Sequence, residues 1–443
     1  MNEPNQIEKS RVFLAGLNTG YSADEFDHSM EELQELAKAC DMEVIGIFTQ
    51  NLPNPITATY IGSGKIAEIK EAIAVHEADA VIFDETLSPI QLRNLADDLD
   101  VSVMDRTALI LRIFKERART KEAMLQVELA NLQYMLPRLV GLHTSLSRQG
   151  GGSGSLSNKG AGETKIELDR RHIEKRITEL KRSLSDVSRE RAVTRSSRER
   201  SGIPKVALVG YTNAGKSTMM NWMIDAFEDK PEKKVFEKDM LFATLDTTIR
   251  KINPGNGNPA FLLSDTVGFI NKLPHSLVKA FHSTLEEVTF ADVILQIVDA
   301  SDEHHADHIR VTRDTLKELG ADTIPCIYVY NKAERIHPRS KLPFIAGDKI
   351  YLSAKEQLGM DALLNMLYET IFGSQKKCEF LLPHSRGDIL NTLFQTAVVS
   401  SYEYREDGIF CSCLCSDKEL KHFAQYCVNK GQYISSRRDI FSL

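Results

Sequence analysis

The chain has 443 residues, and at about 150 residues per domain this length predicts about three domains. Hydrophobic residues make up 42% and charged residues 26% of it, proportions that exclude a disordered or collagen-like protein. No run reaches the roughly 18 to 20 consecutive apolar residues of a membrane helix, and the first residues are polar. We therefore expect neither secretion nor membrane insertion. Seven cysteines, sparse and odd in number, are typical of a reducing compartment, so we expect a cytoplasmic protein.

The net charge of -7 is unevenly distributed. Residues 106–200 contain 21 Lys and Arg against 11 Asp and Glu, a charge of +10, so the remainder carries -17. Such a basic segment is either a solvated helix face or the electrostatic footprint of a partner with a phosphate backbone. Charge alone does not choose between the two interpretations.

Residues 1–105 are predicted to form an α/β domain. Short β-branched runs alternate there with amphipathic stretches, the pattern of βαβ units with a parallel sheet. The strands are expected at 12–14, 44–48, 80–83 and 101–104, with helices at 30–39 and 89–99.

Residues 106–200 are predicted to form a basic helical hairpin. Leucines recur at helical spacing from Leu125 until Pro137, and apolar residues repeat that spacing from Ile173 to Val187. Between them, residues 141–163 are rich in glycine and serine, which predicts a flexible tip. The alternative is a linker between two domains, but two matching apolar stripes bury themselves most simply against each other.

A second α/β region is predicted at residues 201–372, followed by a small α+β domain at 373–443. Strands of the α/β region are expected at 205–209, 261–263, 293–298, 327–329 and 350–352. The small domain is expected to contain a helix at 389–398, a hairpin near 405–408 and a closing helix at 418–428.

A phosphate-binding loop stands between a predicted strand and a predicted helix. The segment Gly-Tyr-Thr-Asn-Ala-Gly-Lys-Ser at 210–217 matches the P-loop pattern, in which backbone N–H groups face phosphate oxygens. Lys216 is expected to reach the β- and γ-phosphates, and the Ser217 hydroxyl to ligate Mg²⁺. The nucleotide-binding residues predicted here are Gly210, Tyr211, Thr212, Asn213, Ala214, Gly215, Lys216, Ser217 and Thr218. The fold class is therefore α/β, a P-loop doubly wound sheet.

Three further motifs follow predicted strands, at the sheet edge where doubly wound folds bind ligands. Asp265 is expected to hold Mg²⁺ through water, and the N–H of Gly268 to contact the γ-phosphate. The segment Asn-Lys-Ala-Glu at 331–334 indicates guanine, whose N1–H and N2–H₂ groups donate to an acidic side chain. The residues predicted to bind nucleotide here are Asp265, Thr266, Val267, Gly268, Asn331, Lys332, Glu334, Ser353, Ala354 and Lys355.

Glu334 stands where the guanine-binding motif has aspartate, and it is one methylene longer. A longer carboxylate can still accept both guanine donors, so GTP is the expected substrate. Relaxed use of GTP and ATP is the alternative.

Two switch segments are predicted. Switch I comprises Phe242, Ala243, Thr244, Leu245 and Asp246, with Thr244 as a second Mg²⁺ ligand and Thr247 or Thr248 as alternatives. Switch II runs from Asp265 to about Pro274. The candidate catalytic residues are Lys216, Thr244 and Gly268.

Phe269 occupies the position at which many GTPases have a water-orienting glutamine. Since a phenyl ring cannot orient water, we predict slow intrinsic hydrolysis, with a group supplied by a partner or a bound cation. Asn213 could ligate a monovalent cation such as K⁺; alternatively it only stabilises the loop.

Taken together, these motifs resemble the HflX-type GTPases. The resemblance covers roughly residues 7–372 and includes the segments at 106–111, 126–134, 136–139, 146–152, 160–163, 167–171, 242–246 and 265–269. It implies a factor that binds the large ribosomal subunit and its rRNA, splits or rescues stalled ribosomes in its GTP state, and is stimulated by that subunit. Glu334 and an extra stretch between Gly154 and Gly160 depart from the family pattern.

We expect a monomer with Mg²⁺ as cofactor and GTP and GDP as ligands. Two alternative functions remain: a nucleotide-sensing RNA-binding module with little turnover, and an RNA-remodelling NTPase with relaxed GTP and ATP use.

Three smaller features have unremarkable expected roles. The segment 62–65 is predicted to be a helix entry rather than a phosphate site, although helix N-termini attract anions. Cys411, Cys413 and Cys415 alternate and are expected to pack in the core rather than to bind zinc. His304, His305 and His308 are expected on a solvated helix surface rather than in a metal site.

Overall fold

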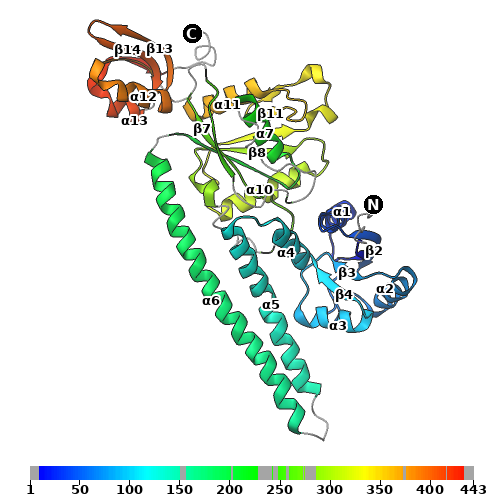
Figure 1. Ribbon diagram of the computed structural model, residues 1–443. Helices are drawn as coiled ribbons and strands as arrows, with labels where there is room; N and C mark the ends of the chain where they lie inside the picture. Colours follow the sequence, from blue (N-terminus) through cyan, green and yellow to red (C-terminus); the bar gives the residue numbers. More distant parts are fainter. Residues whose placement is uncertain are drawn as a thin grey trace, which may run out of the picture. The chain divides into compact units, whose positions relative to one another are not determined.

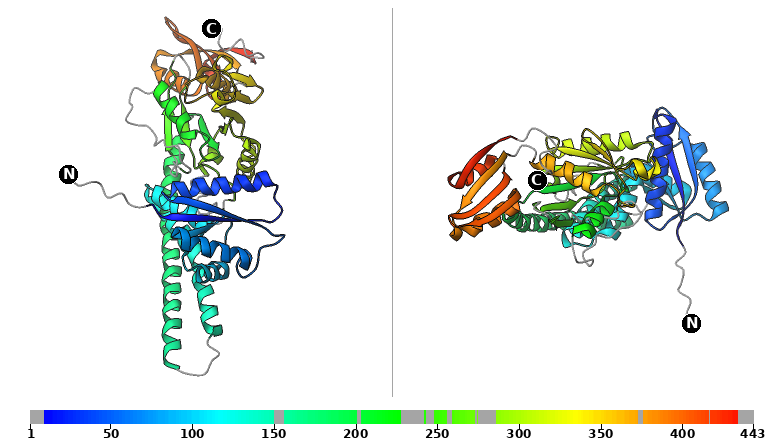
Figure 2. Two further views of the ribbon diagram at one scale, coloured as in Figure 1. Left: turned by 90° about the vertical axis from the view of Figure 1, so that its right-hand side faces the viewer. Right: turned by 90° about the horizontal axis from the view of Figure 1, so that it is seen from above.

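The computed structural model describes residues 9–149, 156–200, 203–227, 242, 248–255, 259–272, 274, 286–372, 376–415 and 417–433. The chain forms two compact units, shown as ribbons in Figures 1 and 2. The first comprises Met1–Ser188, Met240–Leu245 and Asn271–Phe281, and the second comprises Arg189–Asp239, Asp246–Ile270 and His282–Leu443.

The first domain is the predicted parallel α/β sheet. Its strand order is β2-β1-β3-β4, with α1 on one side and α2 and α3 on the other (Figure 1). Serine side chains cap two of its helices, Ser22 at α1 and Ser88 at α3. The predicted strands and both predicted helices are confirmed. The elements are β1 (Arg11–Asn18), α1 (Ala23–Ala39), β2 (Glu43–Asn51), α2 (Ser63–His76), β3 (Ala80–Phe83), α3 (Pro89–Leu99), β4 (Ser102–Asp105) and α4 (Arg106–Arg117).

A buried carboxylate ties the sheet to the hairpin. Asp105 is fully buried and caps α4 by accepting a hydrogen bond from the N–H of Ala108 at 2.8 Å. It also accepts from the Tyr134 hydroxyl at 2.7 Å and from Arg138 Nη2 at 3.0 Å, and Arg138 lies 3.3 Å from the centroid of the Tyr134 ring. Both side chains belong to α5 (Lys121–Gln149), so this one carboxylate fixes the start of the hairpin to the domain.

The helical hairpin is confirmed. In α6 (Leu156–Arg200), Ile177 and Leu180 pack against Leu129 of α5. The linker alternative is therefore wrong. Two details differ from the prediction: α5 continues through Pro137, and the described parts of the predicted tip, residues 141–149 and 156–163, are helical. A proline or glycine inside a helix costs about 1–3 kcal/mol, which the packing of two long helices offsets.

The second unit contains a seven-stranded sheet with the order β10-β11-β9-β8-β5-β7-β6. Only β6 and β10 run antiparallel to their neighbours, so the carboxyl ends of five strands meet at one edge. All five predicted strands are confirmed, whereas β6 and β10 were missed. The elements are β5 (Lys205–Gly210), α7 (Lys216–Phe227), β6 (Thr248–Ile252), β7 (Phe261–Asp265), β8 (Val293–Asp299), α10 (His305–Glu318), β9 (Cys326–Asn331), β10 (Phe344–Ala346), β11 (Lys349–Tyr351) and α11 (Met360–Phe372).

The tail folds as a β-α-β-β-α-β unit with an antiparallel sheet of order β13-β14-β12-β15, the ferredoxin-like arrangement. The predicted hairpin and first helix are confirmed. The closing helix is confirmed in its first part, as α13, but it ends at His422, and the chain from Cys427 instead pairs with the free edge of β12. The elements are β12 (Lys376–Leu382), α12 (Gly387–Thr396), β13 (Val398–Arg405), β14 (Gly408–Cys415), α13 (Asp417–His422) and β15 (Cys427–Tyr433).

The alternating cysteines of β14 face the core of this tail. Cys411, Cys413 and Cys415 are fully buried beside Cys378, as expected for core packing. Within the described ranges, no group of three or more His, Cys, Asp and Glu side chains has a metal-binding arrangement. In the same ranges, no helix has the length and apolar character that crossing a membrane requires.

Candidate nucleotide site

The phosphate loop connects β5 to α7, with its backbone wound around the Lys216 side chain. Lys216 is buried, and its Nζ donates hydrogen bonds to the carbonyl oxygens of Gly210 at 3.0 Å and Tyr211 at 2.8 Å. Burial lowers the pKa of Lys216 to about 8, with Asp265 acting in the opposite direction. The Thr212 hydroxyl, also buried, has no hydrogen-bond partner among the described residues. A desolvated ammonium and an unused hydroxyl in one loop are suited to an anion.

The Ser217 hydroxyl and the Asp265 carboxylate lie side by side. Ser217 Oγ donates to Asp265 Oδ2 at 3.0 Å, and Asp265 is fully buried at the end of β7. A hydroxyl and a carboxylate are the hard oxygen ligands that Mg²⁺ prefers. The residues present therefore fit the metal that the motif predicts.

The start of switch II lies directly on the phosphate loop. Phe269 donates its N–H to the Gly210 carbonyl at 3.1 Å and accepts from the Thr212 N–H at 2.8 Å. A Cβ on Gly268 would come 2.9 Å from Lys216 Nζ and 2.8 Å from a methyl of Thr212. Only glycine fits this close approach. Phe269 is 2% exposed, so an apolar ring fills the position where a water-orienting glutamine would stand.

Asn331, the first residue of the predicted guanine motif at 331–334, is hydrogen-bonded to the phosphate loop. Its Nδ2 donates to the Ala214 carbonyl at 3.0 Å, and its Oδ1 accepts from the Ala354 N–H at 2.9 Å. Gly215 makes room for this amide, because a Cβ there would lie 2.3 Å from Asn331 Nδ2, and the glycine has φ of +97°. Three motifs predicted far apart in the sequence thus meet at one edge of the sheet.

Lys332 and Glu334 lie directly after Asn331, at a short 3-10 turn formed by Ala333–Arg335. Lys332 Nζ pairs with Asp299 at 2.7 Å; burial opposes ionisation of Asp299, but Lys332 and Ser301 lower its pKa. Oε2 of Glu334 is buried and accepts no hydrogen bond from any residue that the structure describes. A buried carboxylate oxygen without a donor is costly unless a ligand supplies one. Lys355 is exposed, whereas Ser353 is buried and accepts from the Glu356 N–H.

Comparison with known proteins identifies the family. Residues 27–115 match the family described as GTP-binding GTPase N-terminal, residues 117–198 its middle region, and residues 205–332 the 50S ribosome-binding GTPase family. A GTPase HflX from Caldanaerobacter subterraneus subsp. tengcongensis is 43% identical over 419 residues, 94% of each chain. The chain belongs to the HflX family of GTPases. HflX GTPases hydrolyse GTP, and so does this enzyme.

A second relative and a solved structure are also similar to this chain. GTPase HflX from Lacrimispora saccharolytica is 43% identical over 410 residues, which is 92% of this chain and 94% of the relative. A solved GTP-binding protein from Sulfolobus solfataricus in complex with GDP is 23% identical with a TM-score of 0.43, and the match covers 82% of this chain and 99% of that one.

The switch I residues of this HflX protein are mostly outside the described part of the chain. The structure does not describe Ala243, Thr244, Leu245, Asp246 and Thr247. The role of Thr244 as a second Mg²⁺ ligand therefore stays a prediction. Thr248 is an ordinary strand residue, opposite Asp265 in the pairing of β6 with β7. Phe242 is buried with its ring edge-on to Phe114 of α4, at 4.7 Å between centroids.

Sequence reasoning missed a residue that packs on the phosphate loop. His308 was expected on the surface, but it is 8% exposed because its ring stacks on Tyr211 of the phosphate loop. Asp302 lies 3.7 Å from His308 Nδ1. The signal available in the sequence was the position of this histidine in the first turn of the helix that follows β8, beside the carboxyl edge of the sheet.

Proposed function

We propose that this HflX GTPase binds the large ribosomal subunit and its rRNA, and that in its GTP state it splits or rescues stalled ribosomes. Exposed cationic side chains along α6 carry the proposal. They point to solvent over several turns, and those of Arg171 and Arg176 are 69% and 50% exposed. The exposed cations are Arg171, Lys175, Arg176, Lys181, Arg182 and Arg189.

Part of this charge is already compensated. Arg176 pairs with Glu128 at 2.7 Å and Arg171 with Glu167 at 3.1 Å. Exposed pairs of this kind contribute only about 0–1 kcal/mol, so rRNA phosphates can compete for the arginines. Lysines and arginines that neutralise phosphates release counterions, which makes binding strong and dependent on salt. The matching family description, 50S ribosome-binding GTPase, supports the choice of the large subunit as partner.

For the nucleotide site, we propose the roles that the sequence motifs predict. Lys216 would bind the β- and γ-phosphates, Gly268 the γ-phosphate, and Glu334 with Asn331 the guanine base. Ser217 and Thr244 would hold Mg²⁺, with Asp265 behind them; when bound, the metal neutralises charge on the phosphates. The phosphate loop and the Ser353–Lys355 segment would complete the nucleotide site. The protein would act as a cytoplasmic monomer.

A monovalent cation is a further part of the proposal. Asn213 is exposed at the turn of the phosphate loop, with φ of +59°. Its side chain is accessible to a K⁺ ion; the alternative is that it only stabilises the loop. Turnover measured in potassium and sodium buffers distinguishes them: faster turnover in potassium supports the ion, and equal rates reject it.

Cosedimentation with ribosomal subunits tests the partner. With the non-hydrolysable analogue GMPPNP, the protein should pellet with large subunits more strongly than with GDP, and should release small subunits from intact ribosomes. Lys181→Glu with Arg182→Glu should weaken binding and reduce the salt slope by roughly 0.7–0.9 per lost phosphate contact. Lys38→Glu, an exposed lysine of α1, is the matched control. Binding unchanged by the α6 substitutions would reject the hairpin as the RNA contact.

The two alternative functions give different outcomes. Absence of multiple turnover with and without ribosomes would favour a nucleotide-sensing RNA-binding module. Equal competition by ATP and GTP would favour an NTPase with relaxed base use.

A further inference from the structure

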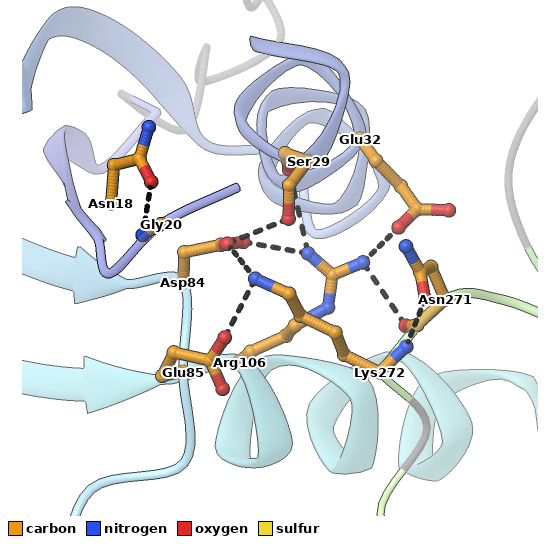
Figure 3. A network of polar contacts seen from close by, with 9 residues as sticks. All are labelled: Asn18, Gly20, Ser29, Glu32, Asp84, Glu85, Arg106, Asn271 and Lys272. Atoms are coloured by element: carbon orange, nitrogen blue, oxygen red, sulfur yellow. Dashed lines mark hydrogen bonds and ion pairs between the residues drawn. The ribbon is translucent and has the colours of Figure 1, made fainter. Parts of the chain in front are cut away.

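A buried arginine organises one side of the first unit. Arg106, the first residue of α4, is 1% exposed. Its Nη1 pairs with Asp84 at 2.7 Å and its Nη2 pairs with Glu32, while the Ser29 hydroxyl donates to Asp84 at 2.7 Å. Figure 3 shows these groups converging from three elements of the domain. Because a buried charge is stable only when it is paired and hydrogen-bonded, the cluster is a rigid support.

Residues of switch II complete this cluster. Arg106 Nη2 donates to the Asn271 carbonyl at 3.3 Å. Lys272 Nζ lies 2.6 Å from Asp84 and 2.7 Å from Glu85 (Figure 3). Burial works against the charged form of Lys272, but the two carboxylates raise its pKa. We name the group formed by Glu32, Asp84, Glu85 and Arg106 with Asn271 and Lys272 the switch II clamp.

The backbone of Lys272 shows that the clamp constrains the segment. Its φ is +53°, a left-handed conformation that costs a residue with a Cβ on the order of 1 kcal/mol. Such a conformation persists when contacts with the surrounding residues hold it in place. Here the side chain is 20% exposed and held by two carboxylates.

The clamp lies a few residues from the γ-phosphate position. Ile270 alone separates Asn271 from Phe269, whose backbone is bridged to the phosphate loop. Gly268 is the next residue, and it lies against Lys216 and Thr212. The segment from Gly268 to Lys272 is therefore anchored at both ends, by the phosphate loop and by the clamp.

We propose that the switch II clamp preorders Gly268 for contact with the γ-phosphate, which makes Asp84, Arg106 and Lys272 positioning residues of the GTP site. An ordered segment loses less conformational entropy when the ligand binds. GDP lacks the γ-phosphate, so the clamp favours GTP over GDP. By linkage, GTP in turn strengthens the clamp, and the first domain senses the nucleotide state. This inference requires guanine-nucleotide binding at the phosphate loop and is independent of ribosome binding.

The test compares nucleotide affinities of the full-length protein. Lys272→Ala should weaken GMPPNP binding about fivefold to tenfold while changing GDP affinity less than twofold. Glu85→Gln, whose side chain is 36% exposed, should shift the ratio in the same direction by a smaller factor, and Lys272→Arg should restore most of it. Lys65→Ala is the matched control, because Lys65 also pairs with a carboxylate at 2.6 Å and is 21% exposed.

An unchanged ratio of GMPPNP to GDP affinity in Lys272→Ala overturns the clamp, whether both affinities stay the same or fall equally. If Lys272→Ala fails to fold, the partly exposed Glu85→Gln decides by the same ratio. If the wild-type protein binds neither nucleotide, the assignment of the nucleotide site fails instead.

Discussion

The rings of Tyr211 and His308 are stacked, with centroids 3.7 Å apart and planes 12° from parallel. Tyr211 is the second residue of the phosphate loop, and the carbonyl of Tyr211 accepts from Lys216. His308 therefore supports the loop from α10, through the ring of the residue whose carbonyl accepts from Lys216.

Removing the stack should weaken nucleotide binding. A stacked aromatic pair contributes about 0.5–1.5 kcal/mol, so His308→Ala should lower GDP affinity roughly twofold to tenfold in a fluorescent-GDP titration. His308→Phe keeps a ring and should retain most of the affinity. His337→Ala, which removes an exposed imidazole, is the control. Equal losses in the alanine and phenylalanine variants would show that the stack does not matter.

Nucleotide affinity should fall as pH rises through the pKa of Lys216. In the nucleotide-free protein this pKa lies at about 8 because of burial. Bound phosphates favour the ammonium form, so binding takes up a proton whenever the lysine is neutral. From the charged fraction, GDP affinity should drop about fourfold between pH 7 and pH 8.5. A titration across this range checks it, and a flat profile would place the pKa of the lysine well above 8.5.

Glu334 should determine the preference for guanine over adenine nucleotides. Its buried oxygen has no donor among the described residues, and the N1–H and N2–H₂ groups of guanine would supply two. Two charge-assisted hydrogen bonds contribute about 2–4 kcal/mol together, so Glu334→Ala should reduce the preference for GTP over ATP about 30-fold to 1000-fold. Competition binding measures the ratio. Glu334→Asp should keep the preference, and equal competition in the wild type would show that the glutamate does not select guanine.

Much of this architecture could be predicted from the sequence because local patterns determine it. Runs of β-branched residues located the parallel strands, and the apolar stripes of α5 and α6 predicted the hairpin. The glycines at 210 and 215 located the phosphate loop. These signals lie within a few residues of one another, so no tertiary information was needed.

The missed features depend on partners that are distant in the chain. Arg106 and Asn271 are 165 residues apart, and no spacing rule connects them. The burial of His308 depends on Tyr211 in the same way. The predicted closing helix ends early, at His422, because the free edge of β12 offers backbone hydrogen bonds to β15, which overrode the local pattern.

The first domain should lose stability sharply without Asp105. This carboxylate accepts from Leu87 N–H at 3.1 Å as well as from Ala108, Tyr134 and Arg138. Its removal leaves a cation and a hydroxyl without their acceptor, which typically costs about 3–5 kcal/mol. Asp105→Ala should therefore lower the unfolding midpoint in urea, whereas Asp97→Ala, an exposed residue of α3, should leave it nearly unchanged. Equal midpoints in both variants would contradict the network.

Hydrolysis without a partner should be slow because of Phe269. The ring is 2% exposed and offers no group to orient water, so the intrinsic rate should be near or below about 10⁻³ s⁻¹, as for GTPases that lack a complete catalytic set. Adding large ribosomal subunits should raise it if they supply the missing group. Multiple-turnover phosphate release with and without subunits measures both rates. Fast hydrolysis by the isolated protein would mean that another residue of this chain orients the water.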